Sequence, residues 1–333
     1  MKRFHCRCGA QLFFENHRCL KCGLDVGFDP QLMIMVPVDG ETSVYCGNWS
    51  DHGVCNWLRP RDNSNHLCAG CQFNRTIPDL TLSNNLKRWA SIEQAKKRLF
   101  FTLMELRLPL ESGWQSPSKG LLFDFLDDER SQPGHYSGSF VTSGFCDGVV
   151  TLNVLEADDA ARAAMQSEML EPYRTLIGHF RHESGHYYWS LVSEDVESTT
   201  MFKDVFGDPK ADYAEALRRY YHDGPSCDWH SSFISTYATS HPLEDWAETW
   251  SHYLYIFDAL QTARAQGLIT DAVEEMTVAE RIVCWQELSI VLNEMNRSVG
   301  GSDAYPFSIG EGVTHKFEAV EEVILRLQAE WTN

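Results

Sequence analysis

The pattern of apolar and polar positions changes along this chain. From Ser83 to Leu108 apolar side chains recur at helical spacing and Pro109 follows, so one helix is predicted there. Residues 148–155 read Gly-Val-Val-Thr-Leu-Asn-Val-Leu after a Cys-Asp-Gly turn, which predicts a strand. From Ala157 onward the pattern is mostly helical and ends in an apolar stripe of Phe317, Val320, Ile324 and Leu327. Strands ahead of a run of helices are typical of the α+β class.

The first 78 residues have a different texture and hold eight of the eleven cysteines. Cys6 pairs with Cys8 and Cys19 pairs with Cys22, and a glycine follows each pair, as a tight metal knuckle requires. Four thiolates at such spacings favour tetrahedral zinc, and His5 and His17 are alternative ligands. A second group follows, formed by Cys46, Cys55, Cys68 and Cys71, with His52 and His66 nearby.

Both cysteine groups predict closed, structural zinc sites with four protein ligands each. Free buried thiols are the alternative, because cysteine is often a small core residue, but the paired spacing disfavours it. A segment this short is rarely stable by apolar burial alone, which is why such segments use metal. We therefore predict a zinc ribbon at 1–30, a second zinc-binding module at 31–78 and a larger body at 79–333. Cys146, Cys227 and Cys284 are interpreted as reduced core residues.

The chain carries a formal net charge of -19, and this excess is unevenly distributed. The first 78 residues have 8 basic and 7 acidic side chains, whereas the rest have 20 basic and 40 acidic. Such an acidic balance argues against nucleic-acid partners, because phosphates would be repelled. No apolar run approaches 18 residues and the first residues lack an apolar export segment, so we expect no membrane contact and a cytoplasmic location.

The strongest chemical motif is Arg181-His182-Glu183-Ser184-Gly185-His186-Tyr187. Residues four apart share a helix face, so His182 and His186 can converge on one metal ion. Glu183 follows the first histidine and can reach a metal-bound water. The alternative is a pair of core histidines satisfied by hydrogen bonds. Tyr213, Tyr220 and Tyr221 also lie at helical spacing and are interpreted as core.

A hydrolytic zinc site needs a third protein ligand and one open position. The extended three-histidine motif is excluded, because Trp189 and Val192 occupy the places of its glycine and third histidine. A better candidate is the helix predicted to start at Pro242, in which Glu244 and Glu248 lie one turn apart. One carboxylate would bind the metal and the other would support a ligand. The alternative for either glutamate is a solvated helix face.

These residues resemble the gluzincin group of zinc metallopeptidases, and among them the lethal-factor-like peptidases. The likeness rests on the two histidines of the short motif and on Tyr237, Glu244, Ala247 and Glu248. It implies that Glu244 is the third ligand, that Glu248 supports a histidine ligand and that Tyr237 stabilises the oxyanion. Asp245 stands where that group has an aromatic residue, so the choice between Glu244 and Asp245 stays open. Tyr187, Tyr188, His230 and His241 are rival oxyanion donors.

The whole chain also resembles a bacterial family in which a zinc ribbon is joined to a zinc metallopeptidase. This likeness implies a zincin-like, mostly helical α+β domain with a small antiparallel sheet, preceded by small β zinc-ribbon modules. It implies one catalytic and two structural zinc ions, and hydrolysis of peptide bonds in which Glu183 takes a proton from zinc-bound water. Peptide would lie along Thr151 and Asn153 at an exposed sheet edge, an interior strand being the alternative.

Two other functions remain open at this stage. The ribbons could bind a partner protein while the body is a vestigial peptidase fold, or the same zinc machinery could hydrolyse the amide of a non-protein substrate. If the acidic excess lines a cleft, the favoured substrate is a cationic peptide.

Overall fold

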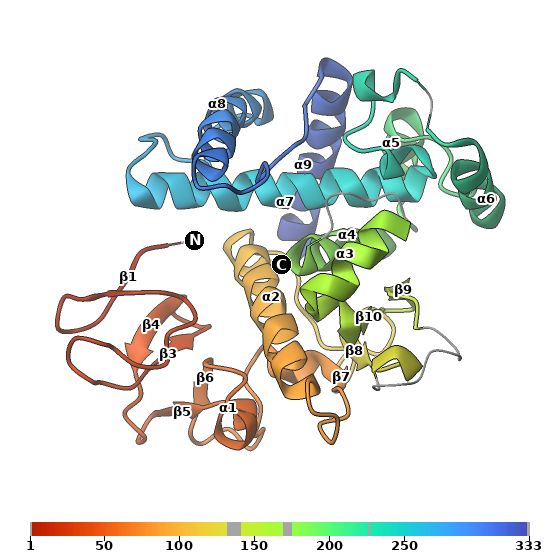
Figure 1. Ribbon diagram of the computed structural model, residues 1–333. Coiled ribbons are helices and arrows are strands. Elements are labelled where there is room, and N and C mark those ends of the chain that lie inside the picture. Colours follow the sequence, from red (N-terminus) through yellow and green to blue (C-terminus); the bar gives the residue numbers. More distant parts are fainter. Residues whose placement is uncertain (1, 132–140, 169–174, 226, 332–333) are drawn as a thin grey trace. The chain divides into compact units, whose positions relative to one another are not determined.

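The computed structural model describes residues 2–131, 141–168, 175–225 and 227–331. Two compact units are present, residues 3–183 and a second unit made mainly of residues 184–333. Helices dominate, the sheets are small and the N-terminal segments are short β hairpins (Figure 1). The α+β class, with small β modules ahead of a mostly helical body, is confirmed. Among the described residues, no helix is both long and apolar enough to cross a lipid bilayer.

Three two-stranded antiparallel sheets make up the N-terminal part of the unit 3–183. The pairs are β1 (Phe4–His5) with β2 (Gln11–Leu12), β3 (Val26–Asp29) with β4 (Ile34–Pro37), and β5 (Ser43–Tyr45) with β6 (Leu58–Pro60). Helix α1 (Gly47–His52) and the 3₁₀ helix η1 (Cys71–Phe73) complete this part. Strands of two to four residues cannot bury much apolar surface by themselves, so other contacts must stabilise them.

An aromatic cluster provides those contacts, and helix α2 (Asn85–Glu105) contributes a ring to it. The rings of Phe14 and Phe28 lie 4.8 Å apart, Phe28 and Trp57 lie 5.0 Å apart, and Phe101 of α2 lies 5.5 Å from Phe14. All four are buried. Aromatic pairs at these separations add packing energy beyond the area they bury. The cysteine-rich segments therefore share one core with α2.

The larger sheet has the strand order β7-β8-β10-β9. Its strands are β7 (Asn74–Thr76), β8 (Leu122–Leu126), β10 (Val149–Asn153) and β9 (Gly144–Cys146). The first three are parallel and only β9 is antiparallel, so the predicted small antiparallel sheet is wrong. The reason lies in the connection, since α2 separates β7 from β8 and provides the long crossover that parallel neighbours need.

The predicted exposed edge along Thr151 and Asn153 is also wrong. β10 pairs with β8 along its whole length, and β9 pairs with it from Val149 to Thr151 on the other side. A two-residue turn at Asp147 and Gly148 folds β9 back, and both residues have positive φ, 46° and 79°, as a tight hairpin turn requires. The Asn153 side chain is buried and donates to Asp128 Oδ2 at 2.7 Å. Its amide is an internal anchor of the sheet.

The rest of this unit leads from the sheet into helix α4. It comprises the 3₁₀ helices η2 (Glu129–Ser131) and η3 (Val154–Ala157), α3 (Asp159–Glu168) and the first part of α4 (Leu176–Val192). Phe180 of α4 packs edge-on against Phe123 of β8, with the ring centroids 5.6 Å apart. The start of α4 is therefore fixed on the sheet.

The unit 184–333 is helical in the residues the structure describes. After the end of α4 come α5 (Val196–Val205), α6 (Tyr213–Asp223), the 3₁₀ helices η4 (Trp229–Ser231) and η5 (Tyr237–Thr239), α7 (Pro242–Gln266), α8 (Val278–Ser298) and α9 (Glu311–Trp331). Helix α7 is the long central element of this unit and contacts both α8 and α9 (Figure 1). The predicted C-terminal stripe is buried. Cys146 and Cys227, expected in the core, are exposed.

Helix α7 begins and ends where its sequence indicates. His241 is the N-cap, its Nδ1 accepts a hydrogen bond from the Leu243 backbone N–H at 3.1 Å, and Pro242 occupies the first turn. Gly267 ends the helix in the left-handed conformation at φ 76°. This start places Glu244 in the first turn of the helix.

Candidate metal centres

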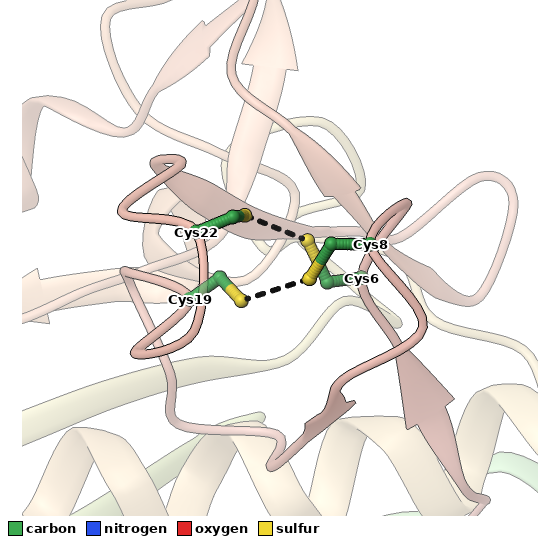
Figure 2. Close-up of side chains that lie close together, drawn as sticks. All are labelled: Cys6, Cys8, Cys19 and Cys22. Carbon is green, nitrogen blue, oxygen red and sulfur yellow. Dashed lines mark hydrogen bonds between the residues drawn. The ribbon is translucent and has the colours of Figure 1, made fainter.

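The first four cysteines converge from two loops. The turn between β1 and β2 carries Cys6 and Cys8, and the loop before β3 carries Cys19 and Cys22 (Figure 2). The Sγ atoms of Cys6 and Cys22 lie 3.6 Å apart, and those of Cys8 and Cys19 lie 3.7 Å apart. A tetrahedral ion with Zn–S bonds of about 2.3 Å requires sulfur atoms about 3.8 Å apart, so this donor set fits zinc.

The second group is similar but wholly buried. Cys46, Cys55, Cys68 and Cys71 each offer a sulfur atom within 4.8 Å of the others. The Sγ atoms of Cys55 and Cys68 are 3.7 Å apart, and the Cys68 backbone N–H donates to Cys46 Sγ at 3.3 Å. These distances also fit tetrahedral zinc, and N–H donors stabilise charge on the sulfur atoms.

The chemistry of this buried group calls for a cation. Burial raises the pKa of Cys68 well above its usual range, and hydrogen bonds to the other thiols raise the pKa of Cys71. The pKa of Cys55 is lowered against the effect of burial, by hydrogen bonds from the other cysteines and by the charge of Lys97. Burial thus opposes charge on these sulfur atoms, and a bound zinc ion would stabilise the thiolate form of all four.

Charged side chains of α2 lie buried beside this site, and the charge of Lys97 acts on Cys55 while Lys96 is paired with Glu93. Lys97 donates to Asn56 Oδ1 at 2.8 Å, and Lys96 donates to Glu93 Oε1 at 3.0 Å. Cys71 Sγ lies 3.8 Å from Glu93 Oε2. A zinc ion with four thiolates carries a net charge of about −2 and needs such cations when it is removed from water.

The third group lies on α4 and α7. Ligand atoms of His182, His186 and Glu244 all lie within 4.8 Å of one another. His186 Nε2 is 3.5 Å from Glu244 Oε1, close to the roughly 3.4 Å that a tetrahedral zinc ion would impose on a nitrogen and an oxygen ligand. Both imidazoles are half-buried and Glu244 is buried. Two neutral nitrogens and one carboxylate fit a zinc site that keeps a position open.

The two small residues inside the motif allow α4 and α7 to approach closely. A Cβ atom at Gly185 would lie 3.0 Å from Ala247 Cα, so only glycine fits without a shift. Trp246 Nε1 donates to the Gly185 carbonyl at 2.8 Å, and Trp250 Nε1 donates to Ser184 Oγ at 3.0 Å. This contact brings the first turn of α7 to the histidine-bearing face of α4.

The structure brings Glu244, not Asp245, to the histidines. Adjacent residues on a helix point about 100° apart, so only one of the two can face the site. The Asp245 carboxylate is buried and its Oδ2 lies 2.6 Å from Lys316 Nζ of α9. Burial raises the pKa of Asp245 to about 7, although the Lys316 charge opposes the shift. Asp245 therefore anchors α7 to α9.

The other residues predicted from the sequence, Glu248 and Tyr237, lie on α7 and on the neighbouring 3₁₀ helix η5. Ser235 Oγ donates to Glu248 Oε2 at 2.6 Å and accepts from the Ala238 N–H at 3.1 Å, which ties α7 to η5. Tyr237 begins η5, half-buried, with its ring 5.9 Å from that of Tyr220. The roles predicted for Glu248 and Tyr237 remain predictions.

The rival oxyanion donors differ in their surroundings. Tyr187 and Tyr188 are buried, and Tyr188 stacks on Trp250. His241 caps α7 and its Nε2 lies 3.1 Å from the Ala211 carbonyl. His230 is exposed on η4. Packing therefore explains the positions of Tyr187 and Tyr188, and helix capping explains that of His241.

Two neighbours of these residues were not predicted from the sequence. Tyr213 of α6 is 42% exposed, although a core position was expected, and its hydroxyl donates to Glu244 Oε1 at 2.8 Å. His179 lies one turn before Glu183 on α4, with its Nε2 3.0 Å from Glu183 Oε1. The four-residue spacing of His179 and Glu183 was a usable signal in the sequence. No local signal joins Tyr213 to Glu244, because 31 residues separate them.

Comparisons with known proteins agree with these groups of ligands. Residues 85–323 match a family described as "Putative zinc-binding metallo-peptidase", and residues 3–82 match a zinc-ribbon domain. Uncharacterized proteins of Mycobacterium bovis and of two Mycobacterium tuberculosis strains are 41% identical over 334 residues, covering 97% of this chain and 95% of each relative. No solved structure matches the chain.

The buried cysteine group gives a direct test of metal content. Replacing Cys55 by serine should remove about one zinc ion per chain and lower the melting temperature, because structural zinc contributes roughly 10–16 kcal/mol of binding energy to folding. Zinc is counted by mass spectrometry of the purified protein. Cys146→Ser is the control, since that exposed cysteine belongs to the same unit but to no ligand group, and its zinc content should equal the wild type. Unchanged zinc in Cys55→Ser would contradict the assignment.

Proposed function

Since this chain belongs to a family in which a zinc ribbon precedes a zinc-binding metallopeptidase domain, we propose that it hydrolyses peptide bonds as a gluzincin-type enzyme. The observation that carries the proposal is that ligand atoms of His182, His186 and Glu244 converge, with Glu183 directly after His182 on α4. His182, His186 and Glu244 would hold the catalytic zinc ion, and the two cysteine groups would hold structural ones, three ions in all. When bound, the catalytic zinc supplies a Lewis acid that polarises the scissile carbonyl and acidifies a water molecule.

Glu183 is proposed as the general base. It follows His182 directly on α4, and its side chain is only 7% exposed. A carboxylate so placed takes the proton of the attacking water and returns it to the leaving amine. Low exposure keeps competing water away and strengthens the electrostatic interactions of the carboxylate.

Two tyrosines take separate roles in this proposal. Tyr237, on the turn that Ser235 ties to Glu248, would donate a hydrogen bond to the developing oxyanion. Tyr213 would instead orient the carboxylate of Glu244, to which its hydroxyl already donates at 2.8 Å. The oxygen that accepts this bond, Oε1, is also the one 3.5 Å from His186 Nε2, so Tyr213 would fix the position of the ligand oxygen itself.

The cysteine modules are proposed to be structural, with protein binding as a second role. The second cysteine group is buried against α2, which limits its use as an independent adaptor. The first group differs, because Leu20, between Cys19 and Cys22, is 96% exposed and Phe13 is 65% exposed. These two apolar side chains favour this ribbon as the contact for a partner protein. Such an adaptor role is the alternative function, with amide hydrolysis of a non-protein substrate as a third.

The general-base role predicts a sharp loss of activity in Glu183→Gln. Peptide cleavage should fall by at least about 10²–10⁴-fold, because the neutral amide accepts no proton, while zinc content stays near that of the wild type. Both are measured on the same preparation, by a quenched fluorescent peptide library and by metal analysis. The control is Glu194→Gln, an exposed glutamate just beyond α4 that should leave cleavage unchanged. Full activity in Glu183→Gln would refute the role.

Measurements of catalysis and of zinc binding should distinguish the roles of Tyr237 and Tyr213. Tyr237→Phe should lower kcat by about 10²–10³-fold at unchanged KM and zinc content, as loss of one oxyanion donor does. Tyr213→Phe should mainly weaken zinc binding, by roughly 10–100-fold, as loss of a group that orients a ligand does. Competition with a zinc chelator measures the second effect. An exchange of these two phenotypes between the variants would mean that the roles are reversed.

The substrate's charge is proposed from the acidic excess of residues 79–333, 40 acidic against 20 basic side chains. Cationic peptides should be cleaved fastest, and their kcat/KM should fall as ionic strength rises from 0.01 to 0.15 M, where the Debye length shrinks from about 30 to about 8 Å. Cleavage profiling of a peptide library at both salt concentrations measures this. A preference for acidic peptides that does not change with salt would contradict the proposal.

A further inference from the structure

A buried chain of hydrogen-bonding side chains leads to Glu183 within the unit 3–183. Ser143 Oγ donates to Glu156 Oε1, and Glu156 Oε2 lies 2.7 Å from His179 Nδ1. On the other edge of the ring, His179 Nε2 lies 3.0 Å from Glu183 Oε1. This series of hydrogen bonds thus connects the loop before β9, the 3₁₀ helix η3 and helix α4. None of these contacts is needed to explain metal binding.

These side chains are buried, so each of their hydrogen bonds needs a donor and an acceptor. The side chains of His179, Glu156 and Glu183 are 7%, 2% and 7% exposed. Two carboxyl groups flank one imidazole, so each contact must contain a proton, either on a ring nitrogen or on a carboxyl oxygen. Contacts of this kind are short, directional and costly to leave unmade away from water. They therefore fix the plane of the imidazole and, through it, one oxygen of Glu183.

The placement of His179 on α4 explains why it acts on Glu183 in particular. The two residues are four apart, so their side chains lie on one face one turn from each other. A glutamate has three side-chain torsions and loses conformational freedom when it is fixed. A base that is already fixed before substrate arrives does not incur that cost in the transition state. Glu156, held by Ser143, fixes the other side of the ring.

We propose that His179 is a positioning residue that holds the Glu183 carboxylate in the orientation hydrolysis requires, with Glu156 fixing the imidazole. This inference rests on the proposed peptidase function. It adds to the site a group that acts on hydrolysis through the general base. Glu156 and His179 together form a support for Glu183 analogous to the partners that orient metal ligands.

His179→Ala tests the inference in the full-length, zinc-loaded protein. We expect kcat to fall about 10–100-fold, with KM within twofold and zinc content equal to the wild type. His179→Gln, whose amide can still donate to Glu183, should retain more activity than His179→Ala. The matched control is His252→Ala, which removes another buried histidine, one whose Nδ1 lies 2.7 Å from the Tyr305 hydroxyl. Its kcat per zinc-loaded chain should stay at the wild-type value.

A second measurement does not depend on activity. Melting temperatures of His179→Ala, Glu183→Ala and the double variant form a cycle, and the loss in the double variant should be smaller than the sum of the single losses. Additive losses, or wild-type kcat in His179→Ala, would overturn the inference while Glu183→Gln stays inactive. Wild-type activity in Glu183→Gln, or no cleavage by the wild type, would instead refute the proposed function, and the positioning role of His179 with it.

Discussion

The close approach of α4 and α7 at Gly185 is the contact on which the candidate catalytic site depends. A Cβ atom at this position would lie 3.0 Å from Ala247 Cα, so the helices would have to shift by a few tenths of an ångström to accept it. Two indole N–H groups, from Trp246 and Trp250, bond to Gly185 and Ser184 and fix the helix pair in register. Glu244 reaches His186 only because the helices are this close and in this register. The small residues between the motif's histidines are thus explained by packing, and the histidines by chemistry.

A second constraint joins the cysteine modules to the body's first helix. The ring of Phe101 in α2 lies among aromatic residues of the hairpins, and Lys96 and Lys97 of the same helix lie buried beside the second cysteine group. Apolar packing and charge compensation therefore act at one surface. Loss of metal from this group would leave the buried charge of Lys97 beside thiols, while Lys96 keeps its ion pair with Glu93, so zinc binding and the folding of α2 are coupled. The first cysteine group is more exposed than the second, and the aromatic residues of its hairpins pack on Phe101 of α2.

The parts of the fold and of the candidate metal sites that depend on neighbouring residues could be predicted from the sequence. The cysteine spacings, the four-residue separation of His182 and His186, and the start of α7 at Pro242 all depend on near neighbours, and the structure brings these residues together as expected. The choice between Glu244 and Asp245 depended on the rotation of α7, which Lys316, 71 residues further on, fixes by its ion pair with Asp245. The pairing of β10 failed as a prediction because strand order is set by long-range contacts, not by alternation within one strand.

His182, His186 and Glu244 are proposed to hold a catalytic zinc ion distinct from two structural ones. Anomalous diffraction at the zinc absorption edge, from crystals of the zinc-loaded chain, tests it most directly. Three zinc peaks are expected, two within the cysteine groups and a third within about 2.0–2.2 Å of the two imidazoles and the Glu244 carboxylate. Two peaks only, both in the cysteine groups, or a third ion bound by Asp245 in place of Glu244, would contradict it.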